Sequence, residues 1–105
     1  MRKIINLLLF LLFFSVSLVA QNTESNEASI LFAEGKYSAA QTLYQQIITN
    51  NTSDENAHYH NARCSKELFA SDAIFLYERF LLSFPFTSFK NEANEDLALL
   101  YYRDF

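Results

Sequence analysis

Two stretches of this chain repeat the same residue types at a fixed offset of 33 positions, and this repetition restricts the fold more than any other feature. The matched pairs are Ser38 with Ser71, Ala40 with Ala73, Leu43 with Leu76, Tyr44 with Tyr77, and Ile47 with Phe80. Within each stretch the apolar residues follow the i, i+3, i+4, i+7 spacing of an amphipathic helix. A helical pattern with this period predicts a repeat in which each pair of helices buries one face internally and offers another face to the next pair.

Residues that begin and end helices separate the apolar runs. Gly35, the only glycine, stands where the end of a helix over residues 27–34 needs a left-handed residue. Pro85 ends the second matched stretch, because proline disfavours the helical conformation in the residue before it. Helix N-caps are predicted at Ser38, at Thr52 with Glu55, and at Ser71 with Asp72. A last helix is predicted from about Ser88, and since no stretch alternates apolar with polar residues, the fold class is all-α.

These positions give the chain a resemblance to the tetratricopeptide repeat family. The first unit matches the family spacing at Ala28, Leu31, Gly35, Tyr37, Ala40 and Tyr44, and the second at Ala73, Tyr77, Phe80 and Pro85. The family fold is an α-solenoid of antiparallel helix-turn-helix repeats. The resemblance therefore implies about two and a half units: residues 27–52, residues 53–85, and a partial unit at residues 86–105. An unrelated helical bundle is the alternative, whereas ankyrin repeats of similar period need a T-P-L-H motif that this sequence lacks.

The second unit departs from the family pattern in its first helix. That helix is the least regular of the predicted ones, with Ala57, Asn61, Cys64 and Leu68 on its best apolar face. Asn61 stands where the family has a small residue, and Leu68 stands where it has glycine. These two replacements predict weaker close packing of this helix.

The chain begins with a pattern typical of an export signal. Arg2 and Lys3 precede an almost unbroken apolar run from Ile4 to Val16, and smaller residues follow. The pattern predicts a secretory signal peptide at residues 1–20, followed by a flexible lead-in at residues 21–26. In the alternative, the N-terminal helix is retained as a membrane anchor, since its length is about the lower limit for spanning a bilayer. Both interpretations export the rest of the chain, to the periplasm or the outer membrane of a bacterial envelope.

Composition and motifs argue against several classes of function. Loss of the signal removes two of eight basic and none of twelve acidic residues, which takes the net charge from −4 to −6 and argues against nucleic acid as a partner. A single cysteine excludes an internal disulfide. His60 and Cys64 lie four positions apart, but two ligands do not close a zinc site, and no motif supplies a residue to orient the histidine for catalysis. We therefore expect no cofactor, no metal and no catalytic residues.

The family resemblance implies a binding function. In such proteins the first helix of each repeat lines a concave groove that holds an extended peptide or a partner helix. The positions of this sequence that fall on that groove are Ser29, Phe32, His58, Ala62, Lys66, Lys90 and Asn94. The last helix is expected to need further repeats or a partner to cover Leu99, Leu100, Tyr101 and Tyr102.

Together these features predict an exported module for protein-protein interaction or scaffolding in the bacterial cell envelope, with no catalysis of its own. Its partner is expected to be a protein or peptide, and its only membrane contact the N-terminal signal or anchor. The alternative function is that of an accessory subunit, a membrane-anchored helical bundle with the N-terminal helix retained.

Overall fold

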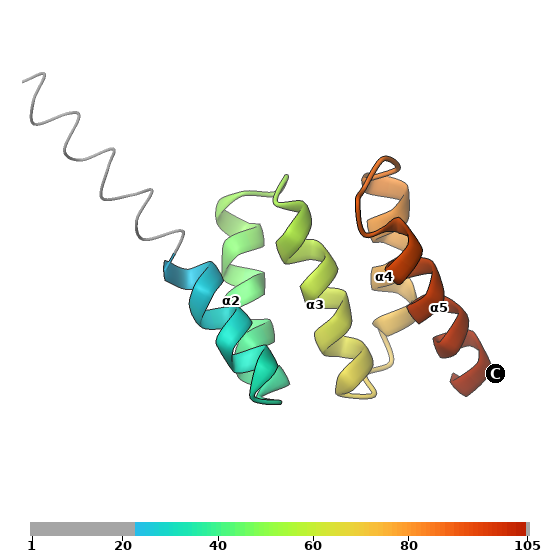
Figure 1. Ribbon diagram of the computed structural model, residues 1–105, viewed down its shortest axis with the longest axis horizontal. Helices are drawn as coiled ribbons and strands as arrows, with labels where there is room; N and C mark the ends of the chain where they lie inside the picture. Colours follow the sequence, from blue (N-terminus) through green and yellow to red (C-terminus); the bar gives the residue numbers. More distant parts are fainter. Residues whose placement is uncertain (1–22, 105) are drawn as a thin grey trace, which may run out of the picture.

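The structure is a computed structural model that describes residues 23–104, and the regular structure of this part is entirely helical (Figure 1). A helix over residues 23–33 is followed by α2 (Tyr37–Asn50), α3 (Glu55–Glu67), α4 (Ala73–Ser83) and α5 (Lys90–Asp104). The predicted all-α class is confirmed for the described residues. The predicted signal peptide, residues 1–20, lies outside them.

The polar lead-in predicted at residues 21–26 is helical from residue 23 onward. Glu24 and Ser25 in this turn are only half exposed, and Ala28 one turn later is fully buried. The polar composition predicted an irregular chain, but packing of one helix face outweighs the weak helix preference of Asn, Ser and Thr. The first helix therefore starts earlier than the sequence indicates.

The helices are arranged in two layers. In Figure 1, residues 23–33, α3 and α5 lie in the nearer layer, and α2 and α4 lie behind them. The main contacts join consecutive helices: α2 with α3, α3 with α4, and α4 with α5. The chain thus advances by alternating between the layers, and each helical hairpin lies beside the next one along the sequence.

The first helix ends at Gly35 as predicted. Gly35 has a φ of 77°, its N–H donates to the Phe32 carbonyl, and the following N–H, of Lys36, donates to the Leu31 carbonyl. These two bonds form a Schellman motif, which satisfies carbonyls that a helix end leaves without partners. No atom would lie within 4 Å of a Cβ at Gly35, so the backbone angle alone favours glycine here.

Helix α3 ends in the same motif, but one residue later than the 33-residue register predicts. Phe69 has a φ of 55°, and its N–H and that of Ala70 donate to the carbonyls of Lys66 and Ser65. Leu68, which the sequence placed opposite Gly35, has an ordinary φ of −82° and is largely exposed. The register assumed a uniform offset, whereas the left-handed residue lies five positions before Ala40 in the first hairpin and four positions before Ala73 in the second.

The predicted N-caps need correction at each place. Asp54 caps α3, since its side chain accepts from the Ala57 N–H, and the predicted pair of Thr52 and Glu55 does not. Helix α2 begins at Tyr37, so Ser38 lies inside it. Asp72 stands at the N-cap of α4 but makes no side-chain cap bond. Asp54 directly precedes α3, and its short side chain reaches the N–H of the third helical residue, Ala57. It therefore caps the helix in place of Thr52.

The last helix begins at Lys90 rather than near Ser88. The Thr87 hydroxyl accepts from the Phe89 N–H, and this turn holds residues 87–89 outside the helix. Leu100, predicted to be uncovered, is 1% exposed because it packs against α4. Its neighbours Leu99, Tyr101 and Tyr102 are exposed.

The core consists of two clusters that share α3. The first joins residues 23–33, α2 and one face of α3: Ala28, Ala40, Tyr44, Ile47, Ala57 and Cys64. The second joins the opposite side of α3 to α4 and α5: Tyr59, Ala62, Ala73, Tyr77, Phe80, Ala93 and Leu100. Helix α3 is buried on both sides, which explains why its sequence shows no single apolar stripe.

Candidate functional site

The seven residues predicted to line a groove lie on helices of the nearer layer and differ widely in accessibility. Ser29, Lys90 and Asn94 are exposed, Phe32, His58 and Lys66 are half-buried, and Ala62 is fully buried. The Ala62 side chain offers no surface to a partner. The remaining six are divided between two surfaces, because His58 turns toward the α2 and α4 side.

The burial of Ala62 follows from the shifted register of α3. Ala62 lies seven residues before the left-handed Phe69, as Ala28 lies seven residues before Gly35, and both alanines are fully buried. Arg63 therefore occupies the place that the sequence assigned to Ala62. Its guanidinium lies 4.4 Å from the ring centroid of Phe32.

An aromatic row crosses the nearer layer. Arg63 stands over Phe32 and, at 5.8 Å, over Tyr59, and the Tyr59 ring stacks on Phe89 at 4.4 Å. Cation–π and stacking contacts of this kind join the helix over residues 23–33, α3 and the turn before α5. Sequence reasoning missed Arg63 and Tyr59, although aromatic residues at 32, 59 and 89, in or beside the predicted first helices of successive units, are a visible signal.

Lys66 is engaged in a polar network and is not a free cation. Its Nζ donates to Asp96 Oδ1 at 2.9 Å, and the Tyr77 hydroxyl donates to Asp96 Oδ2 at 2.9 Å. The Asp96 carboxylate thus links α3, α4 and α5. Burial, and then the Asp96 carboxylate, raise the pKa of Tyr77, so this hydroxyl remains a donor.

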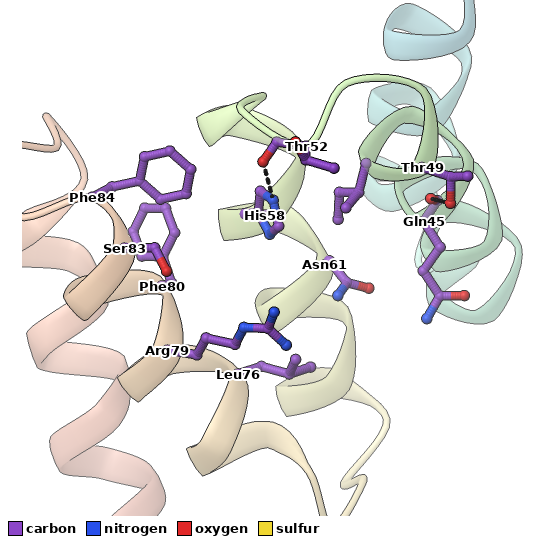
Figure 2. A pocket seen from close by; sticks show the side chains of 11 residues that line it. Gln45, Thr49, Thr52, His58, Asn61, Leu76, Arg79, Phe80, Ser83 and Phe84 are labelled. Atoms are coloured by element: carbon purple, nitrogen blue, oxygen red, sulfur yellow. Dashed lines mark hydrogen bonds between the residues drawn. The ribbon is translucent and has the colours of Figure 1, made fainter.

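A pocket of about 410 Å³ opens between α2, α3 and α4, in the region shown in Figure 2. It is lined by Gln45, Ile48, Thr49, Thr52, His58, Asn61, Leu76, Arg79, Phe80, Ser83 and Phe84. His58 Nε2 lies 2.9 Å from the Thr52 carbonyl oxygen at one end. Seven of these eleven residues are polar and four are apolar, so the pocket offers a ligand both hydrogen-bonding groups and apolar contact.

Two polar groups point into this pocket in Figure 2, the amide of Asn61 and the guanidinium of Arg79. Asn61 is 8% exposed, and its Oδ1 has no hydrogen-bond partner. Arg79 is on the exposed side of α4 and, among residues 23–104, makes no hydrogen bond or ion pair. The sequence predicted Asn61 only as an imperfect core residue and did not single out Arg79.

The only adjacent histidine and cysteine, His60 and Cys64, have the electrostatics of core residues. Burial lowers the pKa of His60 to about 4 and raises the pKa of the Cys64 thiol to about 11. At neutral pH both are uncharged, so Cys64 is a weak nucleophile. Within residues 23–104 no three histidine, cysteine or carboxylate side chains are close enough together to hold a metal ion.

Comparison with known proteins adds no assignment: no family model, no curated protein and no solved structure matches the chain. Among residues 23–104, no helix has both the length and the apolar character that a membrane crossing requires.

Proposed function

We propose that this chain is an exported tetratricopeptide-type repeat module that binds a protein or peptide partner in a bacterial envelope and performs no reaction itself. One observation carries the proposal: two consecutive helical hairpins bury the same residue types at matching places. Ala28, Ala40 and Tyr44 of the first correspond to Ala62, Ala73 and Tyr77 of the second, and all six are at most 1% exposed. Such a series of stacked hairpins typically binds partners on an extended surface.

The layer formed by residues 23–33, α3 and α5 is the proposed partner surface. Ser29 and Asn94 are exposed near its two ends, and the half-buried Phe32 and Arg63 lie between them, beside the buried Tyr59. Aromatic and arginine side chains are the types that most often dominate binding energy at interfaces. A surface with these groups at its centre supports protein binding better than catalysis.

Site-specific photo-crosslinking in the source cell tests this function. A photo-reactive amino acid is placed at Ser29 or Asn94, and as controls at Ala39 of α2 or Phe75 of α4, which are exposed on the opposite layer. We expect one discrete adduct from both Ser29 and Asn94 and none from the two controls. Absence of any adduct from Ser29 and Asn94, or equal adducts from all four positions, would contradict the proposal.

The intact mass of the same exported protein tests its attachment. Loss of residues 1–20 is expected for a cleaved signal peptide. A mass that includes those residues would instead support the alternative of a membrane-anchored accessory subunit, whatever the crosslinking result.

A further inference from the structure

The pocket between α2, α3 and α4 contains a cation that the fold does not use. Arg79 is the only lysine, arginine, aspartate or glutamate among its lining residues. Its guanidinium makes no ion pair within residues 23–104, although the chain as a whole has a net charge of −4. Five guanidinium N–H groups in a planar fork are suited to a carboxylate.

The same pocket contains a buried amide that folding leaves unpaired. Asn61 is more than nine-tenths buried, and its amide points into the pocket (Figure 2). Its Oδ1 is itself inaccessible and has no partner, so the Nδ2 group, which makes no hydrogen bond within residues 23–104, is the part that a ligand can reach. An unpaired buried polar group is unfavourable, so this amide calls for a ligand that accepts a hydrogen bond. Apolar side chains beside it include Ile48, Leu76 and Phe80.

We propose that this pocket binds a short acidic peptide segment of a partner protein. An aliphatic or aromatic side chain lies against Leu76 and Phe80, a neighbouring carboxylate pairs with Arg79, and a peptide carbonyl accepts from Asn61 Nδ2. A peptide supplies the acceptor, the anion and the apolar group in one chain, and a volume of about 410 Å³ is larger than an inorganic anion requires.

This site is separate from the partner surface proposed above. It lies between α2 and α4, in the layer opposite to Ser29 and Asn94, and only His58 was among the residues predicted to bind a partner. Either site can therefore fail while the other holds.

Fluorescence anisotropy on the protein recovered after export tests the proposal. The probe is a fluorescein-labelled Leu-Asp-Leu-Asp-Leu peptide with an amidated C-terminus, and its matched control has asparagine in place of aspartate. Arg79→Gln and Asn61→Leu are each expected to weaken binding of the probe by about tenfold or more, the effect of losing a hydrogen bond with a charged or buried partner. Lys36→Gln makes the same change of charge just before α2, at the end of that helix away from Gln45 and Thr49, and is expected to leave the affinity unchanged.

Thermal melts accompany these titrations. Asn61→Leu removes the unpaired acceptor, so its melting temperature is expected to equal or exceed that of the parent, which separates loss of binding from loss of fold. Three results would overturn the proposal: no binding of the acidic probe up to millimolar protein, equal weakening by Lys36→Gln and Arg79→Gln, or displacement of the probe by free aspartate as effectively as by unlabelled peptide. The last result would identify a small-molecule site instead.

Discussion

The first hairpin, residues 23–50, and the second, residues 55–83, bury matching side chains but surround them with different chemistry. Tyr44 and Tyr77 are equally buried, yet the Tyr44 hydroxyl has no hydrogen-bond partner and the Tyr77 hydroxyl donates to Asp96. After burial, the group that most raises the pKa of Tyr44 is the Cys64 thiol, whereas for Tyr77 it is the Asp96 carboxylate. The helix that follows each hairpin therefore decides whether its central tyrosine is paired.

The two hairpins therefore share the burial of a tyrosine ring and differ in the hydrogen bond of its hydroxyl. Shape and apolar burial are common to both hairpins, so both should depend on the tyrosine ring to a similar extent. The hydrogen bond to Asp96, which also holds Lys66, belongs to the second hairpin alone. Tyrosine-to-alanine variants, which remove the whole ring, and tyrosine-to-phenylalanine variants, which remove only the hydroxyl, measure these two contributions separately.

Removal of either ring gives the largest effect. Tyr44→Ala and Tyr77→Ala are each expected to lower the free energy of unfolding by about 3 to 5 kcal/mol, because each leaves a cavity in a fully buried cluster. Urea denaturation followed by circular dichroism measures the change, and Tyr102→Ala, at an exposed site, is the control. A melting temperature of Tyr77→Ala within about a degree of the parent would refute the packing model.

Removal of the hydroxyl alone should distinguish the two hairpins. Tyr77→Phe is expected to cost about 1.5 to 3 kcal/mol, since it breaks a hydrogen bond to a charged group and leaves a carboxylate oxygen less satisfied. Tyr44→Phe removes a hydroxyl without a partner and is expected to be neutral or slightly stabilising. The same denaturation experiment compares them, and equal costs for the two variants would show that the paired hydroxyl contributes nothing specific.

The sequence predicts the helices and the matched core pairs, because period and apolar spacing depend on local sequence. It misses the register of α3: the left-handed residue that ends α3 lies one position closer to Ala73 than Gly35 lies to Ala40, which moves Ala62 into the core and Arg63 out of it without changing the pattern nearby. It also misses the pocket, whose Asn61 and Arg79 come from different helices and meet only after packing. Contacts between distant residues are the part that periodicity alone does not specify.

Acid is expected to weaken the packing around α3. His60 lies against Phe32 and Tyr44 of the first cluster, with ring centroids 5.9 and 5.3 Å away, and against Tyr59 and Phe89 of the second, at 5.3 and 6.1 Å. Burial, and then the nearby Arg63 charge, lower the pKa of His60 from 6.5 to about 4. Above pH 6.5 the folded and unfolded chains both hold it neutral; between pH 6.5 and 4 only the unfolded chain gains the proton, so stability is lost across that window.

The expected loss at pH 4 is about 1 to 2 kcal/mol, less than the full shift implies because the ring is partly exposed. Urea denaturation at a series of pH values across this window measures the loss. His60→Gln removes the titrating group, so it is expected to abolish the part of the stability loss that comes from His60. The part that comes from protonation of surface carboxylates is expected to remain. An unchanged pH profile in the variant would contradict the assignment.

The smallest contrast concerns the two Schellman motifs. Gly35→Ala is expected to cost about 1 kcal/mol, because alanine disfavours a positive φ and the surroundings of Gly35 are open. Phe69→Gly removes the same backbone cost at the end of α3. It also loses the contact with the Arg103 guanidinium, 4.4 Å from the ring centroid, and increases the conformational entropy of the unfolded chain. The net change in the free energy of unfolding is therefore expected to stay within about 0.5 kcal/mol. Urea denaturation of both variants measures the pair. A clear loss of stability in Phe69→Gly would mean that the Arg103 contact, rather than the backbone, determines the end of α3, and a second variant, Arg103→Gln, should then show an equal loss.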